Sequence, residues 1–178
     1  MSITHVYEEA NQGQWHKVLA AWAHDPDFAQ ACSRFQKPSS GWTFLHQAAY
    51  FGHESACREL IRFGAAVDAL SAKGEAAADV AEQRTYSALG TLLRRAAEGA
   101  QSLWTAPKNV GIFPSSCLWD EARERRATQS MQVAYAGGVA AIPEGSRYFV
   151  DSFERTLVGW HGTYDPPCGM DGESMIEE

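Results

Sequence analysis

The chain has 178 residues, of which 45% are apolar and 21% charged, so it is long enough for one compact domain with an extension and is not disordered throughout. Acidic residues outnumber basic ones by 22 to 15, for a formal net charge of -7. This balance argues against nucleic-acid binding and favours a basic partner if charge steers association.

No stretch of the sequence approaches the roughly 18 consecutive apolar residues of a membrane span, so no membrane association is expected. The first residues contain neither a basic leader nor an apolar run, and we therefore predict no secretory signal and a cytoplasmic protein. Because the cysteines have no paired spacing, we expect reduced thiols and neither a metal nor a cofactor. The cysteines are Cys32, Cys57, Cys117 and Cys168.

Residues 3–37 contain a helical pattern followed by a break. Apolar side chains recur at the spacing of one helix face, and the tryptophans among them are expected in the core. Pro26 ends this helix because proline lacks a backbone N–H and disfavours the helical conformation at the preceding Asp25. The apolar residues of this face are Trp15, Val18, Leu19 and Trp22.

Residues 38–70 predict two helices joined by a tight turn. The Thr43 hydroxyl can cap the start of the first helix, and Gly52 supplies the left-handed residue at its end. The second helix is expected over 54–63 and ends at Gly64. Its apolar stripe consists of Ala56, Cys57, Leu60 and Ile61.

A shift of the chain by 33 residues brings Gly41 over Gly74 and Ala48 over Ala81. Together with the helix pair, this pattern resembles the ankyrin repeat, from which it departs at Phe44, where the family usually has proline. The residues in pattern are Thr43, Leu45, His46, Ala48, Ala49, Gly52, His53, Leu60, Gly64 and Ala65.

The resemblance extends more weakly over about residues 3–100 and implies a short helical solenoid. Residues 1–37 are then a degenerate first repeat, 38–70 the clear repeat and 71–100 a weaker one. In the weaker repeat, Asp79 stands at the histidine position and Thr85 replaces the glycine at the helix end. For His46 the resemblance implies a structural role, in which the side chain ties loop backbone together.

Ankyrin solenoids resemble one another in their scaffold and vary on their concave surface, where partners bind. The positions that the family varies are expected to form the partner-binding surface. They hold Trp42, Tyr50, Phe51, Leu70, Lys73, Glu75, Gln83 and Arg84, with Asn11 and Gln12 at the helix positions of the degenerate repeat. Large apolar groups at such positions suit an interface hot spot. The alternative is that the C-terminal segment folds over them and makes them core.

Residues 101–178 resemble no family that can be named. Prolines make 105–114 loop-like, and Ser115 with Ser116 can cap a short helix over 117–129. Four extended runs then follow, at 131–135, 139–142, 146–150 and 156–161. They predict a small antiparallel β-meander that packs on the last repeat, which makes the fold class α+β.

Polar and aromatic side chains crowd among glycines and prolines at 159–172. The candidates there are Trp160, His161, Tyr164, Asp165 and Cys168. A cysteine nucleophile with a histidine base and a metal bound by three of these residues are both conceivable, but neither has a diagnostic spacing. The other interpretations are a stiff loop that packs its rings on the body and a contact surface for a partner.

We therefore predict a non-enzymatic protein–protein interaction module, with a protein partner and no catalytic residues. An inhibitor or antitoxin-like protein is one form of this function, since the chain is small and acidic. The alternative is a small enzyme, or a metal- or ligand-binding protein, that uses the 159–172 loop. A structural subunit of an assembly is a third possibility.

Overall fold

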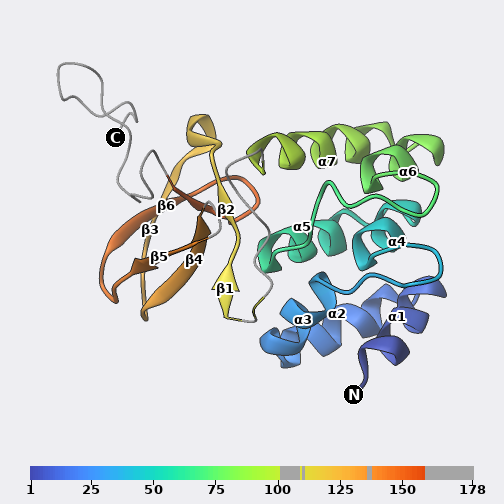
Figure 1. Cartoon of the computed structure of the whole chain (residues 1–178), viewed down its shortest axis with the longest axis horizontal. Helices are drawn as coiled ribbons and strands as arrows, with labels where there is room; N and C mark the ends of the chain where they lie inside the picture. The colour runs from blue at the N-terminus through green and yellow to red at the C-terminus, as the bar shows by residue number, and fades with distance from the viewer. Residues whose placement is uncertain (101–108, 110, 136–137, 159–178) are drawn as a thin grey trace. The chain divides into compact units, whose positions relative to one another are not determined.

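The computed structural model describes residues 1–100, 109, 111–135 and 138–158 (Figure 1). The chain forms two compact units, Met1–Ala97 and Glu98–Glu178. Helices form the first and short strands dominate the second, so the chain is α+β, as predicted. No helix in the described ranges is long and apolar enough to cross a membrane.

The first unit is built from helices that pair along the chain. They are α1 (Ile3–Asn11), α2 (Trp15–His24), α3 (Pro26–Ser33), α4 (Phe44–Tyr50), α5 (Glu54–Phe63), α6 (Ala77–Gln83) and α7 (Ser87–Gly99), whose last residues belong to the second unit. α4 packs between α1 and α6, whereas α3 packs against α5, so the helices lie in two rows (Figure 1).

The helices predicted within residues 38–70 are present, and they begin and end as expected. The Thr43 hydroxyl accepts a hydrogen bond from the His46 backbone N–H at 3.3 Å and caps α4. α5 ends at Gly64, whose φ of 107° lies in the left-handed region that glycine adopts without strain. The predicted stripe of α5 is fully buried and comprises Ala56, Cys57, Leu60 and Ile61.

The turns that follow α1, α4 and α6 share one backbone conformation. Gly13, Gly52 and Thr85 all have a left-handed φ, of 76°, 65° and 68° respectively. Thr85 adopts this conformation although its side chain is β-branched, and its backbone is therefore strained where that of glycine is not. Thr85 therefore has the same left-handed φ as the glycines of the other two turns.

An aromatic core joins the first helices to the 38–70 segment, and Phe44 is at its centre. The Phe44 ring is fully buried, with its centre 5.2 Å from that of Tyr7 and 5.7 Å from that of Trp22. Trp15 and Trp22 are each 2% exposed, so the expectation that the tryptophans are core residues is confirmed. The departure from the ankyrin pattern at Phe44 thus fills space between helices.

The second unit contains two small sheets. Its strands are β1 (Ile112–Phe113), β2 (Ser115–Ser116), β3 (Arg123–Arg126), β4 (Met131–Tyr135), β5 (Gly138–Ile142), β6 (Arg147–Val150) and β7 (Thr156–Leu157). One sheet has the order β1-β4-β5 and the other the order β2-β7-β6-β3. Buried side chains of Ala127, Val133, Ile142 and Val158 form a core cluster.

The predicted antiparallel meander is wrong, because the sheets are mixed. β1 pairs with β4 and β2 pairs with β7 in parallel, and consecutive strands β5 and β6 lie in different sheets. Pro114 stands between β1 and β2 and offers no N–H to a ladder, so the two short strands on either side of it pair separately. These pairings join segments far apart in sequence, which local alternation does not reveal.

The helix predicted over 117–129 is also wrong. Ser115 and Ser116 form β2, residues Trp119–Glu121 form one 3-10 turn, and β3 follows. The charges that favoured a helix instead pair with distant residues, Arg125 with Glu154 in the turn between β6 and β7 at 2.8 Å and Glu124 with Arg147 on the neighbouring β6 at 4.0 Å. Charge spacing alone does not distinguish a helix face from a strand edge.

A buried ion pair holds the turn between β6 and β7. Asp151 is fully buried, and its carboxylate accepts hydrogen bonds from the backbone N–H groups of Phe153 and Arg155 and from the Arg155 side chain at 2.9 Å. A buried carboxylate without such donors would be strongly destabilising.

Candidate functional site

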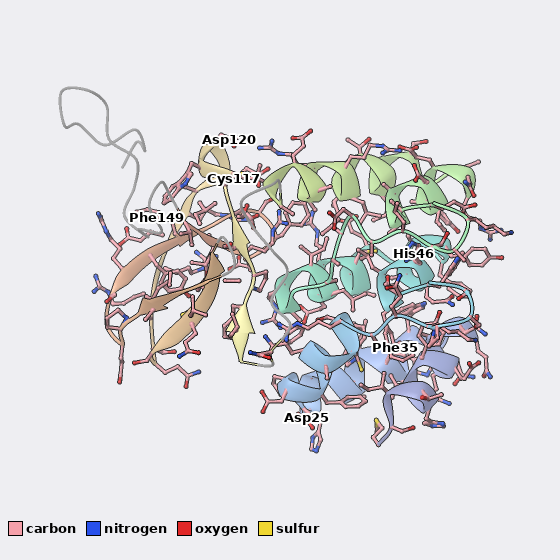
Figure 2. All side chains as sticks on the ribbon, viewed as in Figure 1. Asp25, Phe35, His46, Cys117, Asp120 and Phe149 are labelled. Carbon is pink, nitrogen blue, oxygen red and sulfur yellow. The ribbon has the colours of Figure 1, made fainter. Side chains whose placement is uncertain are left out.

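His46 is a structural residue, as predicted. It lies in the first turn of α4 and is 1% exposed (Figure 2). Its Nδ1 accepts the Thr43 N–H at 3.1 Å, so Nε2 carries the proton and donates it to the Glu75 carbonyl oxygen at 2.8 Å. Burial lowers the pKa of His46 and keeps the ring neutral.

Asp79, in the first turn of α6, binds the loop backbone as His46 does in α4. Its carboxylate accepts the Ala76 N–H at 2.9 Å and pairs with Arg94 at 3.0 Å. The Ala76 N–H and the Arg94 side chain lower the pKa of Asp79. Like His46, the side chain therefore fixes the loop before its own helix.

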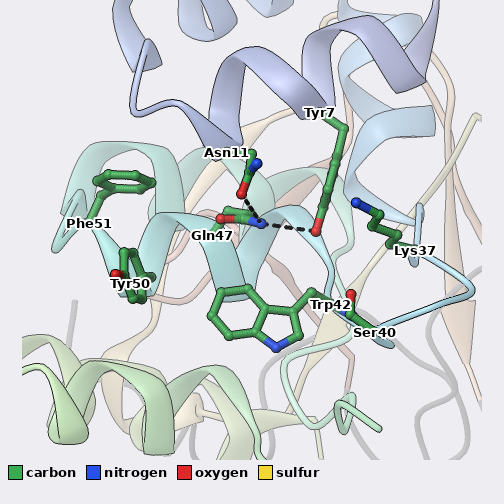
Figure 3. Close-up of a pocket in the computed structure, with 8 residues that line it drawn as sticks. All are labelled: Tyr7, Asn11, Lys37, Ser40, Trp42, Gln47, Tyr50 and Phe51. Atoms are coloured by element: carbon green, nitrogen blue, oxygen red, sulfur yellow. Dashed lines mark hydrogen bonds between the residues drawn. The ribbon is translucent and has the colours of Figure 1, made fainter.

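A pocket of about 570 Å³ opens on the first unit, where α1 faces α4 (Figure 3). We call it the α1–α4 pocket. Its lining combines aromatic rings with short polar groups, as is common where proteins bind ligands or peptide segments. The lining residues are Tyr7, Asn11, Lys37, Ser40, Trp42, Gln47, Tyr50 and Phe51.

Three aromatic rings form one wall of the α1–α4 pocket. The ring centre of Tyr50 lies 6.0 Å from that of Trp42 and 5.2 Å from that of Phe51, each in an edge-to-face arrangement. The Arg84 guanidinium lies over the Tyr50 ring at 4.2 Å from its centre. Phe51 is 36% exposed, so this wall reaches the surface.

A polar network forms the opposite wall. The Gln47 side-chain NH₂ donates to the Tyr7 hydroxyl at 3.0 Å and to the Asn11 side-chain oxygen at 3.3 Å. Lys37 lies 3.6 Å from the Glu8 carboxylate and over the Tyr7 ring. Burial raises the pKa of Tyr7, so its hydroxyl remains protonated.

The structure brings together some of the surface residues predicted from sequence and separates others. Trp42, Tyr50 and Phe51 line the α1–α4 pocket, and Arg84 touches it through Tyr50. The remaining four lie outside its lining. Leu70, Lys73 and Gln83 are exposed, whereas Glu75 is half-buried and binds His46 through its backbone carbonyl.

Half of the pocket lining could not be recognised from the surface positions of the repeat. Tyr7, Lys37, Ser40 and Gln47 were not predicted as site residues. Alignment of Gly13 with Gly52 would have placed Tyr7 at the position of His46, and was an available signal. No signal pointed to Lys37 or Ser40, because they reach the pocket through a loop.

The loop candidates Trp160, His161, Tyr164, Asp165 and Cys168 lie outside the described residues. Within the described part of the chain, no three His, Cys, Asp or Glu side chains gather closely enough to hold a metal ion. Cys32 and Cys57 are free and buried, and burial raises their pKa values to about 11 and about 12. These two thiols therefore stay protonated.

Residues 40–72 match the family model for the ankyrin repeat. A curated relative, oxysterol-binding protein-related protein 1 of Mus musculus, is 36% identical over 70 residues. The aligned stretch covers 39% of this chain but only 7% of that protein, so the two share a segment and not a whole architecture. The helix pair α4–α5, with the loops on either side of it, is therefore an ankyrin repeat.

Proposed function

We propose that the chain binds a protein partner through the concave surface of a short ankyrin solenoid. Protein–protein interaction is the role that an ankyrin repeat supports, and residues 40–72 are such a repeat. The observation that carries the proposal is the aromatic wall, in which Trp42, Tyr50 and Phe51 adjoin one another in one pocket. The proposed surface also includes Leu70, Lys73, Glu75, Gln83 and Arg84.

The proposed solenoid has three units, with a degenerate repeat before the clear one and a weaker repeat after it. The shared left-handed turns at Gly13, Gly52 and Thr85 support this division. So does the placement of α4 between α1 and α6, since stacked repeats bury their core against their neighbours.

We further propose a non-enzymatic role, as an inhibitor or antitoxin-like protein whose partner is basic. The net charge of -7 supports this, since an acidic protein attracts a basic partner over distance. Association is then expected to weaken as salt is added. Oxysterol binding is not proposed, because the similarity covers only 7% of that relative.

The test is partner capture from the native host by the immobilised chain, with mass spectrometry of the bound proteins. The double variant Trp42→Ala with Phe51→Ala is expected to lose the specific partner while it still unfolds cooperatively. A matched control is Val139→Ala, which truncates a 51% exposed side chain on β5. Equal capture by the double variant and the natural sequence would contradict the proposed surface.

A further inference from the structure

The α1–α4 pocket has the chemistry to select one class of guest. We propose that it receives a large uncharged side chain, aromatic or branched aliphatic, from an extended segment of the partner. In the same complex, a backbone N–H of that segment donates to Gln47 Oε1. This inference rests on the proposed function and adds the chemistry of the bound segment.

The orientation of the Gln47 amide is determined by its neighbours. The Asn11 NH₂ faces the Glu8 carboxylate at 3.5 Å, which turns the Asn11 oxygen towards Gln47. The Gln47 NH₂ therefore points at the oxygens of Asn11 and Tyr7, and both of its hydrogens are used. Its own oxygen lies on the other side, towards the wall of Tyr50 and Phe51 (Figure 3).

Gln47 Oε1 is an acceptor that lacks a donor within the described part of the chain. Although only 6% of the residue is exposed, the Gln47 side chain lines the pocket, and its oxygen is not among the atoms that are both buried and unpaired, so water reaches it there. None of the hydrogen bonds described for this residue uses its side-chain oxygen. A guest that fills the pocket displaces this water, so it must itself bring an N–H to keep the acceptor from being buried without a partner.

The guest's backbone must be extended to supply this N–H. In a helix, the backbone N–H groups beyond the first turn are bonded to carbonyl oxygens four residues earlier. In an extended segment, an N–H is free to donate sideways. The volume of about 570 Å³ lies within the range of about 300–1,000 Å³ typical of ligand pockets, so a side chain enters together with its peptide group.

Charge at the pocket favours a neutral side chain. A cationic guest would meet Arg84, which already lies over the Tyr50 ring, and Lys37 at the other wall. An anionic guest would place its oxygens against Gln47 Oε1 and against the electron-rich faces of the rings. For an anion the two cations are already engaged, Arg84 with the Tyr50 ring and Lys37 with Glu8, so neither sign of charge gains a strong partner inside.

The test is an NMR titration of the full chain with capped single residues, followed through the backbone amides of Tyr50 and Phe51. The probes are the N-acetyl, N′-methylamide derivatives of Phe, Leu, Arg and Glu. The Phe and Leu derivatives are expected to bind at least about tenfold more tightly than the other two. A Phe derivative methylated on both amide nitrogens has no backbone N–H to donate and is expected to lose about fivefold in affinity.

Two variants locate the binding on the protein. Gln47→Met removes the acceptor and should abolish the difference between the Phe derivative and its N-methylated form. Tyr86→Ala truncates a 38% exposed ring that does not line the pocket, and should leave all affinities unchanged.

Tighter binding by the Arg or the Glu derivative would overturn the proposal, as would no saturable shift with any probe. These results are distinguishable from failure of the proposed function. If the probes fail while partner capture still depends on Trp42 and Phe51, then the surface is right and its guest is wrong.

Discussion

Thr85 adopts the left-handed backbone that Gly52 adopts 33 positions earlier, with φ angles of 68° and 65°. The two residues follow the first helix of successive helix pairs, so the turn requires this conformation whichever residue occupies it. Threonine therefore sits where glycine is the unstrained choice.

Replacement of Thr85 by glycine is expected to stabilise the first unit. A non-glycine residue in this region costs about 1–2 kcal/mol, and the added freedom of glycine in the unfolded chain cancels part of the gain. We expect a net increase of about 0.5–1 kcal/mol in the free energy of unfolding, measured by urea denaturation. Thr85→Ala keeps the Cβ atom and should gain much less; a similar gain from both variants would refute the backbone explanation.

Gly41 and Gly74 provide a matched pair for a second prediction. Both are left-handed, with φ of 69° and 77°, and they are equivalent in the repeat. A Cβ at Gly41 would lie 2.7 Å from the backbone nitrogen of Ala72, whereas a Cβ at Gly74 meets no described atom within 4 Å. The Ala72 N–H is held by the Ser40 carbonyl, so that backbone cannot easily move.

We therefore expect Gly41→Ala to cost about 2 kcal/mol or more and Gly74→Ala about 1 kcal/mol, because only the first adds a steric clash to the backbone strain. Urea unfolding of the two variants measures the difference. Equal losses would mean that the close approach at Gly41 does not contribute.

The first unit is expected to become less stable as the pH is lowered, because the buried His46 side chain is then protonated. Burial holds the folded-state pKa of His46 below its ordinary value of 6.5, although Glu75 and Asp79 oppose this shift. The unfolded chain therefore binds the proton more readily, and the contribution of the neutral ring is complete above pH 6.5. It is lost as the pH falls through the folded-state pKa.

His46→Gln isolates this effect, because glutamine does not titrate. The free energy of unfolding should drop less in the variant than in the natural sequence between about pH 7 and about pH 5. Identical pH profiles for the two proteins would rule out His46 as the source.

In the second unit, the buried ion pair of Asp151 and Arg155 is expected to contribute more to stability than the exposed ion pairs. Asp151→Asn removes the charge that faces the buried guanidinium and should cost about 3 kcal/mol. Glu154→Gln breaks the pair with Arg125, in which both side chains are about 40% exposed. It should lower the free energy of unfolding by less than about 0.5 kcal/mol. Thermal unfolding of both variants gives the comparison, and a Glu154→Gln loss as large as that of Asp151→Asn would contradict it.

The sequence by itself determined the local elements. Thr43, Gly52 and Gly64 mark the helix ends of the 38–70 repeat, and alternation marks β4 and β5, because caps, left-handed residues and side-chain periodicity act over a few residues. The aromatic half of the α1–α4 pocket also followed from repeat positions. These features need no knowledge of distant contacts.

Only the tertiary structure decided which distant segments meet. The polar wall depends on Gln47 reaching Tyr7 across 40 positions, and the parallel pairs β1–β4 and β2–β7 join strands that no turn connects. Phe44 breaks the repeat pattern, yet its ring fills the core beside Tyr7 and Trp22. Such contacts depend on how whole elements pack, and local periodicity carries no information about that register.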